Sequence, residues 1–138
     1  MVMPIKHSYS LCNFIVLKFN VMTTQVVATK FYEYMQQGAF DKIYAELYSE
    51  NASSEEGSGS DWPKANGMKE IYEKGKRWNE SIKEMHGGTT EKPIVGGNYF
   101  CCRMTMDFTP KIGQRVKMDE LGLYKVEDGK IVSEQFFS

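Results

Sequence analysis

The strongest constraint on the fold is a pair of alternating stretches on either side of Asp128-Gly129, near the end of the chain. Residues 115–127 and 130–137 alternate apolar and polar side chains, as strands with one buried face do. An Asp-Gly pair tolerates the positive φ angles of a tight turn. The two stretches therefore predict an antiparallel hairpin that turns at residues 127–130.

Each strand of this hairpin carries one carboxylate on its mostly apolar face. Because successive side chains point to opposite faces, Glu120 shares a face with Met118 and Tyr124, and Glu134 shares one with Phe136. A carboxylate in an apolar wall is costly unless it is paired or protonated. Glu120 and Glu134 are therefore candidate functional residues.

Length and charge exclude several classes of protein. The 138 residues suit one domain with a sizeable core. Lys and Arg number 17 against 18 Asp and Glu, and there is no long basic block. Nucleic acid and anionic membrane surfaces are therefore not expected partners.

The first 21 residues are expected to be an upstream extension outside the core. Their apolar run, residues 11–19, is interrupted by Asn13 and Lys18 and is too short to span a bilayer. A signal peptide is the alternative, since Lys6 precedes the run, but no small-residue cleavage site follows. The domain is therefore expected to occupy residues 22–138, with Thr23 or Thr24 capping its first helix.

Cysteine and histidine usage predicts no metal site and no cofactor. Three cysteines, two of them adjacent, form neither a disulfide framework nor a metal-binding spacing, and a reducing cytoplasm suits them. No glycine-rich phosphate loop or nucleophile elbow is present either.

Apolar periodicity predicts three helices before a run of strands. The helices are expected at residues 24–37, 40–48 and from 66 or 67 to 82, the last with Ile71, Tyr72, Gly75 and Trp78 inward and Lys74 among its solvated charges. Strands are expected at 52–56, 92–95 and 99–109, and residues 86–88 are expected in a loop or at a strand end. Helices first and antiparallel strands last indicate an α+β fold.

This order of elements resembles a SnoaL-like protein of the nuclear transport factor 2-like superfamily, over about residues 23–138. The matching segments are Leu-Tyr-Ser-Glu-Asn-Ala at 47–52, His-Gly-Gly at 86–88, Met-Asp-Glu at 118–120 and the hairpin at 124–132. The resemblance implies a cone-shaped half-barrel, whose curved, mostly antiparallel sheet packs on three N-terminal helices and encloses a pocket. The superfamily contains ketosteroid isomerases, polyketide cyclases, dehydratases and non-catalytic binders.

The resemblance also assigns isomerase positions. The general-base carboxylate falls on Glu56, the tyrosine that donates to the oxyanion falls on Phe31, and the protonated aspartate falls on Gly122. The last two lack the donor group, which argues against a ketosteroid isomerase of the usual design.

The predicted inward side chains describe a small-molecule pocket with apolar walls and a few polar groups. The candidate catalytic residues are Glu56, Glu120, His86 and Tyr124. The candidate ligand-binding residues are Trp62, Trp78, Phe100, Met104, Met106, Met118, Glu134 and Phe136. The expected function is proton transfer of isomerase, cyclase or dehydratase type on a hydrophobic carbonyl compound. The alternative is a non-catalytic ligand-binding or dimerisation module.

Structural interpretations stay open for these residues. Glu120 can be a buried carboxylate that only satisfies Tyr124 or His86, and Glu134 can be solvated near the chain end. Trp62 and Trp78 can be plain core residues. Glu56 can belong to a solvated acidic loop, and His86 can have a structural role.

The outer face of the sheet is expected to form a homodimer interface. It mixes apolar side chains with paired charges, as such interfaces do. Its residues are Arg103, Thr105, Asp107, Asp119, Leu121 and Leu123.

Overall fold

The computed structural model describes residues 23–138. The expected extension at residues 1–21 lies outside the described residues. Within residues 23–138, no helix is long and apolar enough to cross a membrane.

The first helix begins and ends where its sequence predicts. Helix α2 spans Thr24–Gln37, and the Thr23 hydroxyl accepts a hydrogen bond from the Val26 amide at its start. Gly38 ends the helix in the left-handed conformation, with φ 67°. One face of α2 is buried, at Val27, Ala28 and Phe31. Phe31 contacts the sheet through the rings of Phe100 and Tyr124.

The second predicted helix consists of two consecutive segments of different helix type. It begins as α3, Phe40–Lys42, and continues directly as the π-helix η1, Ile43–Leu47. Strand β1, Tyr48–Glu55, follows at once and so begins four residues before the predicted strand. The short strand β2, Ala65–Asn66, was not predicted, and helix α4, Met68–Ser81, comes after it.

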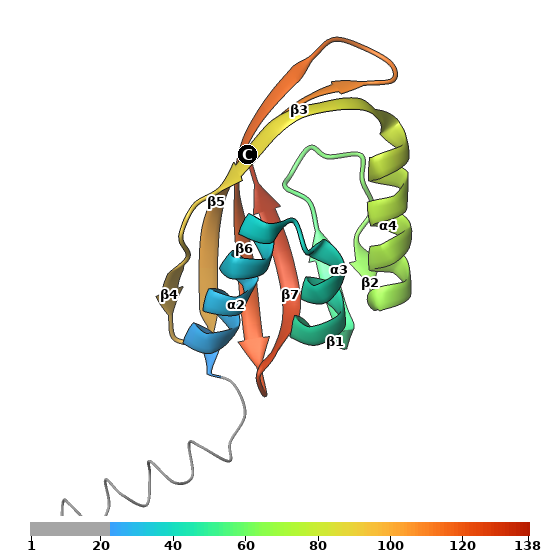
Figure 1. Ribbon diagram of the computed structural model, residues 1–138. Helices are drawn as coiled ribbons and strands as arrows, with labels where there is room; N and C mark the ends of the chain where they lie inside the picture. The colour runs from blue at the N-terminus through green and yellow to red at the C-terminus, as the bar shows by residue number, and fades with distance from the viewer. Residues whose placement is uncertain (1–22) are drawn as a thin grey trace, which may run out of the picture.

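All described strands belong to one mixed sheet of order β2-β1-β7-β6-β5-β3, with β4 also paired to β5. The remaining strands are β3 Ile82–Thr90, β4 Ile94–Gly96, β5 Tyr99–Pro110, β6 Val116–Glu127 and β7 Lys130–Phe137. Every pairing is antiparallel except that of β1 with β7. In Figure 1, α2 and α3 lie over one face of the sheet and α4 stands beside them. This is the α+β fold that the sequence predicts.

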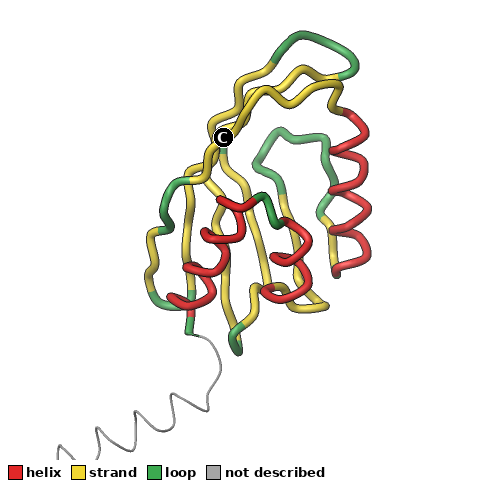
Figure 2. The backbone as a smooth tube through the Cα atoms, in the orientation of Figure 1, coloured by secondary structure: helices red, strands yellow, loops and turns green. Residues whose placement is uncertain are grey.

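Strand β3 contains residues 86–88 in its interior, where the sequence predicted a loop or a strand end. Its side chains are largely exposed, so no apolar alternation marks it as a strand. Pairing with β5 holds it in place, and Gly88 lies so close to β5 that a Cβ there would come 2.9 Å from the Thr105 carbonyl oxygen. Figure 2 shows this segment continuing from the end of α4 across to the sheet.

The hairpin turn confirms its prediction. Asp128 and Gly129 have φ angles of 49° and 74°, as a tight turn with two positive φ angles requires. The turn pairs Glu127 with Lys130, and a one-residue register shift between Lys125 and Val126 then pairs Tyr124 with Glu134 and Gly122 with Phe136. Both carboxylates of the hairpin therefore point to the inner face of the sheet, where Glu120 and Glu134 are 8% and 6% exposed.

Candidate functional site

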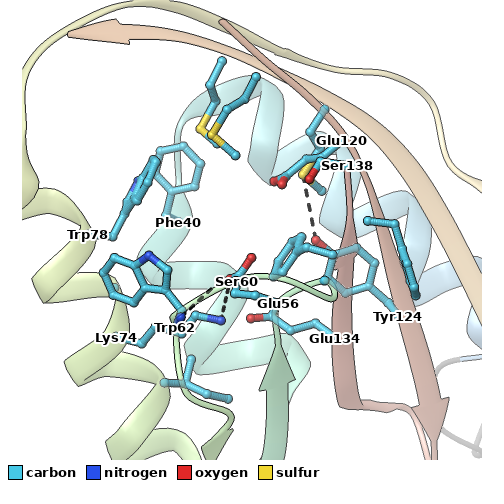
Figure 3. Close-up of a pocket in the computed structure, with 18 of the residues that line it drawn as sticks. Phe40, Glu56, Ser60, Trp62, Lys74, Trp78, Glu120, Tyr124, Glu134 and Ser138 are labelled. Carbon is cyan, nitrogen blue, oxygen red and sulfur yellow. Dashed lines mark hydrogen bonds and ion pairs between the residues drawn. The ribbon is translucent and has the colours of Figure 1, made fainter. Parts of the chain in front are cut away.

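A pocket of about 620 Å³ lies between the inner face of the sheet and the helices. This volume falls in the range of roughly 300–1,000 Å³ that small-molecule sites occupy. Trp62, Trp78 and Phe40 lie on one side of the pocket and Glu120 and Tyr124 on the other (Figure 3). The remaining apolar lining includes Phe31, Met35, Ile43, Tyr44, Ile71, Met104, Met106, Met118 and Phe136.

Glu120 is the pocket carboxylate without a partner. It lies on β6 opposite Met104 of β5 and makes no side-chain hydrogen bond or ion pair with any residue in the described part of the chain. Burial raises its pKa to about 7, and the negative charges of Glu56 and Glu134 add to the rise while Lys74 opposes it. The Glu120 carboxyl can therefore exchange a proton near neutral pH.

The alternative in which Glu120 only satisfies Tyr124 or His86 is wrong. The Tyr124 hydroxyl lies 4.0 Å from the Met104 sulfur, and His86 Nε2 lies 2.7 Å from the Thr109 hydroxyl. Neither group is bonded to Glu120.

Glu56 enters the pocket at the end of β1 as one half of an ion pair. Its Oε1 lies 2.6 Å from Lys74 Nζ of α4. Lys74 Nζ also donates a hydrogen bond of 2.9 Å to Ser54 Oγ. Glu56 therefore belongs to a partly buried ion pair in the pocket, and the interpretation that it lies in a solvated acidic loop is wrong.

Lys74 corrects the sequence prediction, which placed it on the solvated face of its helix. Its side chain is only 16% exposed and borders the pocket. The sequence did contain a signal, because position 74 follows Ile71 by three residues and precedes Trp78 by four. Those spacings place all three on one helical face.

Glu134 is buried and not solvated, which overturns the interpretation based on its nearness to the chain end. The Tyr48 hydroxyl donates a hydrogen bond to its Oε2. Burial raises the pKa of Glu134, while the hydrogen bonds from Tyr48 and Ser54 oppose that rise. Tyr48 and Tyr44 are pocket residues that the sequence placed only on an apolar helical stripe.

Tyr124 fills the space beside Gly122. Its ring stacks on Phe100, with centroids 4.8 Å apart, and tilts against Phe31 at 4.7 Å. Burial raises the Tyr124 pKa well above its ordinary value, so the hydroxyl stays protonated. It borders the pocket as a neutral hydrogen-bond donor.

Two predicted pocket residues lie elsewhere. His86 is on β3, where it contacts Thr109 and lies 3.9 Å from Glu84, outside the pocket lining. Phe100 is 1% exposed and packs within the core under Tyr124. His86 was predicted to face the pocket, but strand β3 carries this side chain away from it.

Trp62 and Trp78 both border the pocket and are only partly buried. The guanidinium of Arg77 lies 4.9 Å from the centroid of Trp62, and Trp78 meets Phe108 edge to face at 5.1 Å. Met104, Met106, Met118 and Phe136 also lie in the lining, as predicted. Among residues 23–138, no group of three or more His, Cys, Asp or Glu side chains is arranged to hold a metal ion.

Comparison with known proteins points to one family. A family model described as a SnoaL-like domain matches residues 22–138. A Mesorhizobium loti protein with the provisional name SnoaL-like polyketide cyclase is 36% identical, with a TM-score of 0.79 over 85% of this chain and 100% of that one. None of the curated proteins compared with the chain matches it.

More distant solved structures share the fold. A nuclear transport factor 2-like protein of Burkholderia thailandensis is 15% identical, with a TM-score of 0.72 over 85% of this chain and 91% of that one. A Bacillus subtilis protein with the provisional name isomerase is 21% identical, with a TM-score of 0.59 over 83% of this chain and 88% of that one.

Proposed function

The chain belongs to the SnoaL-like family, and we propose that it is an enzyme that moves a proton on a hydrophobic carbonyl compound with Glu120 as the general base. One observation carries the proposal. Glu120 is a carboxyl group without a partner among the described residues, and it stands in the largely apolar wall of a pocket large enough for a small molecule. Such a group is suited to take up and return a proton near pH 7.

The reaction class follows from this acid–base group. A base beside an apolar ligand can remove a proton from the carbon next to a carbonyl, a step that isomerases, cyclases and dehydratases share. The provisional name of the Mesorhizobium loti relative supports a reaction of cyclase type. The neutral Tyr124 hydroxyl is available to donate a hydrogen bond to the ligand.

The aromatic walls favour a flat ligand. Trp62 and Trp78 stand across the pocket from Glu120 (Figure 3), and methionines line the sheet beside it. Aromatic and thioether side chains bind flat apolar groups through large contact areas.

Proton exchange on a simple ketone tests the proposal. We expect the protein to accelerate deuterium exchange at the carbons next to the carbonyl of 2-tetralone in D₂O, followed by NMR. Glu120→Gln should abolish the acceleration. The matched control is Glu80→Gln, a change at a side chain that is 63% exposed on α4. Equal exchange by wild type and Glu120→Gln would refute Glu120 as the base.

A non-catalytic binding role is the second candidate, and the positions of Phe31 and Gly122 favour it. Neither side chain can donate a hydrogen bond to an oxyanion, and such a donor is worth several kcal/mol in a transition state. In that case 2-tetralone would bind, as seen by the fluorescence of Trp62 and Trp78, while its exchange rate stayed at the uncatalysed value.

A reducing cytoplasm is the proposed location. Cys101 and Cys102 are both free thiols, and burial raises the Cys102 pKa to about 12. Unpaired thiols of this kind persist where glutathione keeps cysteines reduced.

A further inference from the structure

Lys74 is the one cationic side chain among the described residues that line the pocket. It reaches the pocket from α4 with its side chain 16% exposed. Glu56 and Ser54 each receive one of its hydrogen bonds. An ammonium has three N–H donors, so one remains for a ligand.

The proposed chemistry needs a group that binds a negative oxygen. Removal of a proton beside a carbonyl leaves the charge on that oxygen, and a hydrogen-bond donor or a positive charge in the pocket must stabilise it. The Tyr48 hydroxyl already donates to Glu134, and the Tyr124 hydroxyl is a neutral donor beside a thioether. Lys74 offers a full positive charge in the same space.

Resting on the proposed function, we propose that Lys74 binds the carbonyl oxygen of the substrate and stabilises the enolate that forms when Glu120 removes the neighbouring proton. The C–H bond breaks and its proton goes to a Glu120 carboxylate oxygen. The C–H electron pair forms a carbon–carbon double bond, and the carbonyl π pair moves onto oxygen. One negative charge thus passes from Glu120 to the substrate, and the charges of Lys74 and Glu56 stay unchanged.

The same charges define the class of substrate. Glu56, Glu120 and Glu134 all border the pocket, so a ligand that is already anionic on binding meets repulsion. A neutral, enolisable ketone with a flat apolar body avoids this repulsion and becomes negative only after Glu120 has been neutralised. The substrate class is therefore an uncharged aromatic or polycyclic ketone, and not a carboxylic acid.

A coloured phenol tests the role of Lys74 without turnover. A nitronaphthol mimics the enol when protonated and the enolate when ionised, and its absorbance reports which form is bound. We expect wild type to bind it in the protonated form and to favour its ionisation, because its proton passes to Glu120 and Lys74 holds the oxyanion, so that its titration midpoint falls relative to free solution. Lys74→Met should weaken binding of the ionised form by about tenfold or more, since an ammonium-to-oxyanion hydrogen bond is lost. Lys74→Arg should retain most of the preference for the ionised form.

Two further variants keep the test interpretable. Lys74→Met leaves Glu56 without its partner, so the double variant Glu56→Gln/Lys74→Met removes both charges of the pair and should show the same loss. Lys76→Met changes a lysine that is 77% exposed on the same helix and should bind like wild type.

Wild type that fails to bind the nitronaphthol, or a double variant that still lowers its midpoint, would overturn the role of Lys74. The nitronaphthol midpoint can depend on Lys74 while the protein fails to accelerate deuterium exchange of 2-tetralone. That outcome would refute the proton-transfer proposal and leave Lys74 as the group that binds the anionic oxygen.

Discussion

Gly122 has no room for a side chain because the ring of Tyr124 lies where its Cβ would point. A Cβ at position 122 would come 2.9 Å from both the hydroxyl and Cε2 of Tyr124, and 3.1 Å from Cε of Met104. The Tyr124 ring cannot move aside, since Phe31 and Phe100 pack against it. The isomerase aspartate that the family resemblance places here is therefore incompatible with Tyr124.

Gly122→Ala should destabilise the fold by about 1–3 kcal/mol, the usual cost of overpacking a core. Urea denaturation measures this change. The control is Gly96→Ala in β4, where a Cβ would meet nothing within 4 Å. In a Tyr124→Leu background, the same Gly122→Ala change should cost much less. An equal cost in both backgrounds would contradict the steric explanation.

Glu120 should make stability fall with rising pH. Between its ordinary pKa of 4.5 and the folded-state pKa of about 7, the folded state holds a proton that the unfolded state has lost. The free energy of unfolding therefore decreases as the pH rises through this interval and stays lower above it. Glu120→Gln should be more stable than wild type at pH 8 by about 1–2 kcal/mol, allowing for screening by water in the open pocket.

The advantage of Glu120→Gln should shrink to about 0.4 kcal/mol or less at pH 4.5, where Glu120 is almost fully protonated in the folded state and half protonated in the unfolded state. Urea denaturation at the two pH values gives the comparison. A glutamine variant less stable than wild type at pH 8 would show that Glu120 is held in its charged form by contacts in the folded protein.

The long strands could be predicted because a strand with one buried face alternates apolar and polar residues along the sequence. Strands β5, β6 and β7 each bury one face. From Phe100 onward, the apolar positions of the sequence largely coincide with the buried positions of these strands. The inward position of both hairpin carboxylates followed from the alternation within each strand. The register that brings Glu134 beside Tyr124 did not follow from the turn alone, because a one-residue shift between Lys125 and Val126 separates the two.

The polar partners in the pocket could not be predicted in the same way. The partner of Glu134 is Tyr48, 86 residues away, and the contact exists only because β1 pairs in parallel with β7. Strand β3 lacks an apolar face, so nothing local revealed that His86 belongs to a strand. Lys74 was missed for a different reason. Its charge indicated a solvated position, although its spacing from Ile71 and Trp78 places it on their helical face.

Tyr48→Phe should destabilise the protein by about 1–3 kcal/mol, because Glu134 is buried and loses a donor. The loss should be greater at high pH, since the hydrogen bond favours the charged carboxylate and opposes the rise in its pKa. Tyr72→Phe is the control, at a tyrosine that is 49% exposed. Equal denaturation midpoints for the two variants would show that the Tyr48 hydroxyl contributes nothing to stability.

The outer face of the sheet is the surface where we propose that two copies associate. Leu121 is 48% exposed there, next to Arg103, which is paired with Asp119 at 2.8 Å. A mixture of apolar and paired charged side chains is typical of such interfaces. Sedimentation velocity should therefore show a wild-type dimer.

Leu121→Asp should convert that dimer to a monomer, because a new carboxylate in an apolar contact is costly to desolvate. Ile112→Asp makes the same kind of change at a side chain that is 92% exposed in the β5–β6 turn, away from this face, and should remain dimeric. A wild-type monomer at high concentration would refute association altogether. A dimer that survives Leu121→Asp would place the interface on another surface of the protein.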